Sequence, residues 1–209
     1  QARVDLLIPM VKGWCTDLGV EISSLALQVH GGTGFIEETG IAQHYRDARI
    51  APIYEGTNGI QAIDLVGRKV LRDKGVAMGA FVNDANTLLK KAKTDEKSQP
   101  IVAAAEEALK ELTATTDWLV KIAASDQETA LAGATAYLRL FGAVAGGVMH
   151  ARAAQIAASQ ADDCDPKFYA AKLASAQFYA DHVLPQTAAL SLSIRKGHPS
   201  VLALDIDQF

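Results

Sequence analysis

The chain has 209 residues, of which 49% are hydrophobic, 21% charged and 6% aromatic, a composition that excludes intrinsic disorder and suits one or two domains with a sizeable core. Its 20 basic and 24 acidic residues give a net charge of −4, and the basic residues are scattered, so no nucleic-acid partner is expected, because phosphate backbones require concentrated positive charge. The longest apolar stretch is well short of the roughly 20 residues of a membrane span, no signal peptide is visible and cysteines are few, which favours the cytoplasm with no membrane contact.

Hydrophobic periodicity is helical nearly throughout the chain, which predicts an all-α fold. Over residues 3–29 the apolar spacing of three and four predicts one continuous face on a long helix, or on a kinked pair near Gly19. The positions of this face are Val4, Leu7, Val11, Trp14, Leu18, Ile22, Leu25 and Val29. The glycine-rich run at residues 31–34 then breaks the helix, because glycine tolerates positive φ and lets other groups approach the backbone.

A short helix is expected over residues 39–49, followed by a turned or extended segment at Pro52. Thr57 or Asn58 can cap the next helix, with Gln61 as the back-bonding partner of a capping box. That helix is expected to end near Gly75, where the character of the sequence changes. We therefore predict two modules, residues 1–75 and 76–209, and place any chemistry in the first.

The second module is expected to be a helical bundle. A helix is predicted over residues 76–93, and apolar stripes over residues 101–123 and 131–148 have the spacing of antiparallel bundle helices. The glycines at 142, 146 and 147 would let helices approach closely.

The last long helix is predicted to begin at Asp165, as the cap, and Pro166, at the first helical position. Pro185 should kink it. From Gly197 to the end, a strand-like or coiled surface arm is expected.

Metal and nucleophile motifs are absent from the sequence. The five histidines show no metal-ligand spacing, so no metal site is expected, and no GxSxG serine motif occurs. Cys15 and Cys164 are expected to be buried small hydrophobes. The glycine-rich run is not a dinucleotide fingerprint, because Glu37 stands where a third glycine is required and a helix, not a strand, precedes it.

One loop, residues 53–61, has two interpretations. Glu55 lies just before a predicted helix start, beside Gly56 and next to apolar Tyr54. In the structural interpretation, the helix macrodipole favours an acid there by about 0.3–1 kcal/mol. In the functional interpretation, apolar walls desolvate the carboxylate, raise its pKa and make it a base for a weakly acidic carbon.

Three motifs carry a family resemblance. They are QVHGGTGF at residues 28–35, YRDARI at 45–50 and IYEGTNGIQ at 53–61. In this order and at these separations they resemble the C-terminal helical domain of the acyl-CoA dehydrogenases, and the match covers about residues 1–75. Residues 76–209 resemble the additional C-terminal domain of a longer bacterial subgroup with methylthiopropanoyl-CoA dehydrogenase-like members.

The resemblance implies a catalytic role for Glu55. It would abstract the α-proton of an acyl-CoA while the β-hydride passes to FAD, giving the 2,3-enoyl-CoA. Its backbone N–H, with a flavin ribityl hydroxyl, would polarise the thioester carbonyl, and Gly56 would lie along the substrate.

The resemblance also implies two groups of FAD contacts. Gln28, Gly31 and Gly32 would contact the adenosine-diphosphate end of an FAD held mostly by a neighbouring subunit, where close backbone approach explains the glycines. Thr57, Asn58 and Gly59 would touch the flavin pyrophosphate. Arg46 and Asp47, the RD pair of the family, are expected to form an internal ion pair rather than a substrate contact.

By the same resemblance the chain is a fragment of a homo-oligomeric enzyme that passes electrons to an electron-transfer flavoprotein. It lacks the N-terminal helical and middle β-domains of the family and starts at Gln1 without Met, so we expect that alone it neither retains FAD tightly nor turns over. The alternative is a non-catalytic helical module for oligomerisation or interaction. A membrane-associated extension is disfavoured because no basic amphipathic face is evident.

Overall fold

The computed structural model describes residues 1–160 and 165–208, and all regular structure in these residues is helical, which confirms the all-α fold. In chain order the elements are α1 (Ala2–Val29), α2 (Gly32–Phe35), the 3-10 turn η1 (Glu37–Thr39), α3 (Ile41–Ile50), α4 (Asn58–Ile63), the π-helical η2 (Asp64–Leu71), α5 (Val76–Ala92), α6 (Gln99–Ile122), α7 (Gln127–Ala132), α8 (Ala134–Ser159), α9 (Pro166–His182), α10 (Gln186–Val201) and the 3-10 turn η3 (Ile206–Gln208).

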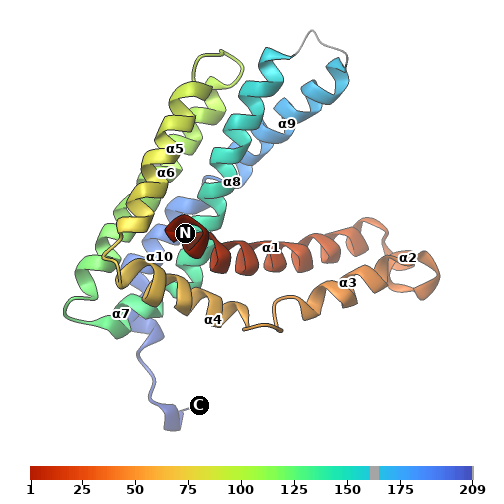
Figure 1. Ribbon diagram of the computed structural model, residues 1–209. Coiled ribbons are helices and arrows are strands. Elements are labelled where there is room, and N and C mark those ends of the chain that lie inside the picture. Colours follow the sequence, from red (N-terminus) through yellow and green to blue (C-terminus); the bar gives the residue numbers. More distant parts are fainter. Residues whose placement is uncertain (161–164, 209) are drawn as a thin grey trace.

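The chain has an arm and a bundle (Figure 1). The arm consists of α1, which leaves the bundle, and α3, which returns alongside it, with α2 at the tip. Helices α5, α6, α8, α9 and α10 form the bundle, and α4 with η2 leads from the arm back into it. Helix α1 also packs on α8, so contacts cross the predicted module boundary at residue 75. The division into two modules there stays a prediction.

Helix α1 is a single helix across Gly19, as one of the two expectations had it. The predicted apolar face is not the buried side of this helix: the residues buried against the bundle are Leu6, Pro9, Met10 and Gly13. Much of the expected face is exposed instead: Ile22 is 61% and Val29 is 86% accessible. Helical spacing marks an apolar stripe, but which helix covers it depends on neighbours that the spacing does not name.

The two cysteines have different outcomes. Cys15 lies on the exposed side of α1, so the expectation that it is buried is wrong. Cys164 lies outside the described residues.

Close helix packing in the bundle depends on glycine, as predicted. A Cβ at Gly142 would overlap the Trp14 ring, one at Gly146 would overlap the Tyr179 hydroxyl, and one at Gly147 would lie 2.6 Å from a Leu184 methyl group. Helix α8 therefore packs against α1 and against the segment 179–184 without intervening side-chain volume.

We expect Gly142→Ala and Gly79→Ala to change stability in opposite directions. Both glycines are inside helices, where alanine is favoured by about 1 kcal/mol. The space beside Gly79 is open, so its substitution should raise the free energy of unfolding by about 0.5–1 kcal/mol. At Gly142 the clash with Trp14 outweighs that gain, and overpacking should lower the free energy of unfolding by about 1–2 kcal/mol net. Urea unfolding followed by circular dichroism checks both, and equal shifts would contradict this packing.

Buried hydroxyl groups in the bundle are paired. The Thr116 hydroxyl lies 2.6 Å from that of Tyr137, joining α6 to α8, and the hydroxyls of Thr115 and Ser191 are 2.8 Å apart, joining α6 to α10. Burial raises the pKa of Tyr137, so its phenol stays neutral in the core. These pairs remove the penalty of leaving buried polar groups without partners.

The last helices depart from prediction at two places. Asp165 caps α9 as expected, accepting from the Phe168 N–H at 3.0 Å, with Pro166 at the first position. Pro185 does not kink one helix; it lies between two, because proline lacks the N–H that a continuous helix requires. The expected coiled arm from Gly197 begins later than predicted, since α10 continues to Val201 and only residues 202–208 form an exposed tail.

His150 on α8 stacks on Tyr179 of α9, with ring centroids 4.4 Å apart. Burial, and secondarily the positive charge of Lys172, lowers the pKa of His150. Between that pKa and the unfolded value of about 6.5, the unfolded chain binds more protons, so stability should fall as the pH drops below about 6.5. We expect His150→Phe, which keeps the stacking, to flatten this dependence in unfolding measurements from pH 7 to 5. If stability falls equally steeply with pH in the wild type and in His150→Phe, His150 is not the source of this pH dependence.

Candidate functional site

The loop between α3 and α4 has an unusual backbone. Glu55 has φ +55° and Gly56 has φ +81°, so two consecutive residues adopt the left-handed region. Glycine does this freely, but for a residue with a side chain it costs on the order of 1–3 kcal/mol and persists only where the surroundings enforce it. Strain of this kind gathers at functional sites, and here it falls on the acid that the sequence singled out.

Two side chains hold this turn. Lys12 of α1 donates from Nζ to the Gly56 carbonyl at 2.8 Å, and Gln61 of α4 donates from Nε2 to the carbonyls of Glu55 (3.3 Å) and Gly56 (3.4 Å). The expected capping box is therefore wrong: Thr57 occupies the N-cap position without a side-chain cap bond, and the Gln61 side chain reaches past the cap to the strained turn.

Asn58 connects this loop to α1. Its side-chain amide donates to Asp17 Oδ1 at 2.7 Å and to Thr16 Oγ1 at 2.9 Å, and its carbonyl oxygen accepts from Lys12 at 2.8 Å. Its backbone N–H donates to the Pro52 carbonyl at 3.0 Å. The polar groups of Asn58 are thus engaged inside the chain, a role that the motif alone did not indicate.

The Glu55 side chain is exposed. Its apolar neighbours Ile53 and Tyr54 are 47% and 52% accessible, so the described residues do not supply the apolar walls of the functional interpretation. The N–H of Glu55 makes no hydrogen bond within the part of the chain that the structure describes. Both the carboxylate and this N–H are therefore without a partner in the described residues.

A second group of predicted residues lies at the tip of the arm. Gln28, Gly31 and Gly32 are exposed where α1 meets α2. Gly31 has φ +61°, and open space surrounds the positions where Cβ atoms would lie on Gly31 and Gly32. Close approach within the chain occurs instead at Gly34, where a Cβ would lie 2.5 Å from the Leu27 carbonyl oxygen.

The structure does not bring the two groups together. Thr57, Asn58 and Gly59 share one loop with Glu55 and Gly56. That loop meets α1 at Lys12, and Gln28 lies about 24 Å further along the helix axis at the usual rise per residue. A ligand contacted by both groups would have to be long, or there would have to be one ligand for each.

Arg46 forms an internal ion pair, as expected, but its partner is Glu37 rather than Asp47. Two bonds join the guanidinium to this carboxylate, one of them 3.1 Å long. Asp47 accepts from Gln43 at 3.4 Å. The pair ties α3 to η1 and so shapes the tip of the arm.

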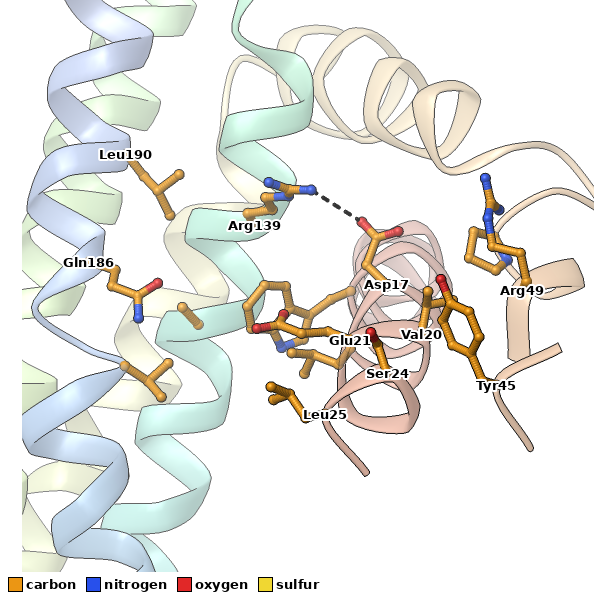
Figure 2. Close-up of a pocket in the computed structure, with 15 residues that line it drawn as sticks. Asp17, Val20, Glu21, Ser24, Leu25, Tyr45, Arg49, Arg139, Gln186 and Leu190 are labelled. Carbon is orange, nitrogen blue, oxygen red and sulfur yellow. Dashed lines mark ion pairs between the residues drawn. The ribbon is translucent and has the colours of Figure 1, made fainter. Parts of the chain in front are cut away.

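A cleft of about 630 Å³ lies between the arm and the bundle (Figure 2). Asp17 and Glu21 enter it from α1, Arg49 from α3, and Arg139 from α8, and Arg139 pairs with Asp17 at 4.0 Å. Glu55 does not line this cleft. Of these four residues only Arg49 lies in a motif that the sequence singled out, and no motif pointed to the cleft itself, because the fold joins its residues from distant parts of the sequence.

Residues 1–160 and 165–208 contain neither a metal-binding cluster nor a membrane-spanning helix. No group of three or more His, Cys, Asp or Glu side chains is placed to hold a metal ion. None of the described helices combines the length and apolar character that a bilayer crossing requires.

Comparison with known proteins identifies the family. Residues 1–71 match the family model "Acyl-CoA dehydrogenase, C-terminal domain", and residues 77–205 match "Acetyl-CoA dehydrogenase C-terminal like". The chain belongs to the acyl-CoA dehydrogenase family, as its motifs predicted.

Two relatives align with nearly the whole of this chain, but the aligned region is only about a third of each relative. The chain is 44% identical to 3-methylmercaptopropionyl-CoA dehydrogenase of Ruegeria pomeroyi, over 99% of this chain and 35% of the relative. It is 30% identical to the broad-specificity linear acyl-CoA dehydrogenase FadE5 of Mycobacterium tuberculosis, over 96% and 34%. The chain therefore spans about a third of the length of these relatives.

The fold has a counterpart among solved structures. ACDH-11 of Caenorhabditis elegans, solved in complex with C11-CoA, superposes with a TM-score of 0.64 at 23% identity, over 88% of this chain and 30% of that one. At this identity the likeness is one of fold.

Proposed function

We propose that the chain is the C-terminal part of an FAD-dependent acyl-CoA dehydrogenase that oxidises an acyl-CoA to the 2,3-enoyl-CoA. One observation carries the proposal: in a member of this family, the Glu55 carboxylate stands exposed on a strained turn that Lys12 and Gln61 hold in place. The names of the relatives at 44% and 30% identity support a CoA thioester as substrate.

Glu55 acts as the general base in this proposal. Its carboxylate takes the proton from the α-carbon, and its unengaged N–H donates to the thioester carbonyl, which makes the α-proton more acidic. Gly56 lies along the substrate. A side chain at this position would also crowd Gln61, since a Cβ would come within 3.1 Å of Gln61 Nε2. Bound FAD supplies the acceptor for the hydride from the β-carbon.

The residues proposed for FAD contact fit that role unequally. Gln28, Gly31 and Gly32 present open backbone and a free amide side chain at the arm tip. In the loop, Thr57 and Gly59 are exposed and remain available to a phosphate group. Asn58 contributes by holding the turn, because its side-chain amide and its N–H are already engaged.

The separation of about 24 Å between arm tip and base loop is compatible with an FAD shared between subunits of a homo-oligomer. Electrons then leave to an electron-transfer flavoprotein, and the cytoplasm is the proposed compartment. The chain alone, with Glu55 lacking apolar walls, is proposed to be inactive and to bind FAD weakly.

A second candidate function rests on the exposed apolar side chains of α1, which include Val4, Ile8 and Ile22. Apolar stripes of this kind mark interaction surfaces. In this alternative the chain is a non-catalytic helical module for oligomerisation or interaction, and Glu55 has a structural role only.

Product analysis decides between the two functions. The full-length protein is incubated with saturated acyl-CoA thioesters and an artificial electron acceptor, and the thioesters are then analysed by mass spectrometry. The enzymatic proposal predicts a product that lacks two hydrogens, with the new double bond between C2 and C3. Unchanged thioesters from a folded protein containing FAD would favour the interaction module.

A further inference from the structure

We infer that Lys12 is a positioning residue for the base, acting through the backbone of the turn that carries Glu55. The inference rests on the proposed function, because it assigns Lys12 a part in the same reaction. Lys12 does not touch the Glu55 carboxylate; its bonds go to the residues that follow Glu55 in the chain.

Lys12 bridges two points of the loop. Its ammonium group donates at 2.8 Å to the Gly56 carbonyl and at 2.8 Å to Asn58 Oδ1, so one cation fixes both the end of the strained turn and the first residue of α4. Hydrogen bonds from a charged donor are roughly twice as strong as neutral ones. Lys12 is half-buried, which reduces screening of these bonds by solvent.

These bonds act on the conformation of Glu55. The carbonyls of Glu55 and Gly56 define the two peptide planes that follow the Glu55 Cα, and Gln61 and Lys12 hold both planes. Without them, Glu55 gains by relaxing from φ +55° to negative φ, where side chains are unstrained. That relaxation redirects its Cα–Cβ bond and moves the carboxylate away from the substrate.

The other end of this network is anchored to the bundle. Asn58 donates to Asp17 Oδ1 at 2.7 Å, and Asp17 pairs with Arg139 of α8 at 4.0 Å. The loop is therefore tied to α1 and, through Asp17 and Arg139, to α8 of the bundle. A lysine that served only to join α1 to α4 would need no bond beyond the one to Asn58. Lys12 also donates to the Gly56 carbonyl, which belongs to the strained turn itself.

The test compares Lys12→Met, Lys12→Arg and the control Lys90→Met in the full-length protein. Lys90 is an exposed lysine of α5. Single-turnover reduction of bound FAD is followed at saturating and at limiting acyl-CoA and across pH. Hydrogen exchange of residues 53–61 is measured without substrate, so that one readout is independent of activity.

We expect Lys12→Met to slow FAD reduction at saturating substrate by roughly 10- to 100-fold, the loss that a misplacement of about 1 Å causes. The substrate concentration for half-maximal rate, the FAD content and the melting temperature should stay near those of Lys90→Met. Exchange in residues 53–61 should quicken, and Lys12→Arg should restore most of the rate, because a guanidinium can still donate to the carbonyl.

Wild-type rate and exchange in Lys12→Met would overturn the inference, as would a lost rate with unchanged exchange in residues 53–61. If Lys12→Met does not fold, Gln61→Met removes the other donor to the Gly56 carbonyl, together with the donor to the Glu55 carbonyl. It must then reproduce the slow rate and fast exchange, and wild-type behaviour there overturns the inference. Glu55→Gln separates the two claims: full rate in that variant rejects the proposed function, whereas loss of rate there beside an unaffected Lys12→Met rejects only the role of Lys12.

Discussion

Replacing Glu55 with glutamine is expected to slow reduction of FAD by acyl-CoA by roughly 10²–10⁴-fold, the usual contribution of a general base. Glutamine keeps the size and the backbone of the turn but cannot take the α-proton. Because Glu55 is exposed and its side chain forms no ion pair or hydrogen bond in the described residues, the stability of the fold should change by less than about 0.5 kcal/mol.

Anaerobic rapid mixing measures this effect as the decay of flavin absorbance. Glu38→Gln is the matched control, since Glu38 is also exposed, lies at a helix start and loses the same charge. The control should react at the wild-type rate. If Glu55→Gln reacts as fast as Glu38→Gln, Glu55 is not the base and the structural interpretation of this acid is preferred.

The second large effect is expected at the arm tip, where Gly32→Val should reduce FAD retention. Gly32 does not have positive φ, and the space around it is open, so valine fits the chain without a clash. A side chain there would obstruct a cofactor that approaches the backbone. Overpacking of about 1–3 kcal/mol corresponds to an affinity lower by roughly 5- to 150-fold.

The flavin-to-protein ratio after gel filtration of the full-length protein checks this expectation. Gly79→Val is the control, because Gly79 also has open surroundings but lies on α5, away from the proposed contacts. Full FAD content in Gly32→Val would show that the cofactor does not contact this turn. Equal loss in both variants would point to a general effect of valine on folding.

Local sequence signals predicted much of the fold. The glycine-rich run ends α1, Asp165 caps α9, and the stripe that includes Ile101, Leu112 and Leu119 is buried in α6. Each of these features depends on residues within a few positions of one another, so spacing and propensity are sufficient.

Features that depend on distant residues could not be predicted in this way. Lys12 meets Gly56 across 44 positions of the chain, and no local pattern pairs an unremarkable helical lysine with a loop carbonyl. The apolar stripe of α1 was visible, but whether a stripe is buried depends on which neighbours are present. At Pro185 a kink in one helix was predicted, whereas the structure has two separate helices; which of the two forms occurs depends on packing.

The candidate site shows the same division. The motif singled out Glu55 by resemblance, and the structure adds the strained turn and the side chains that hold it. The functions of Gln28, Gly31, Gly32 and the loop residues stay predictions, because they concern a cofactor and subunits outside this chain.

The proposed dehydrogenase function is tested most directly by an anaerobic titration of the natural full-length protein with saturated acyl-CoA, recorded as an absorbance spectrum together with the intact mass. We expect a protein far larger than this chain, with flavin bands at about 370 and 450 nm. The band at the longer wavelength should bleach as enoyl-CoA forms in amounts equal to the flavin. A colourless natural protein of only these 209 residues, or a flavin band that acyl-CoA leaves unchanged, would contradict it.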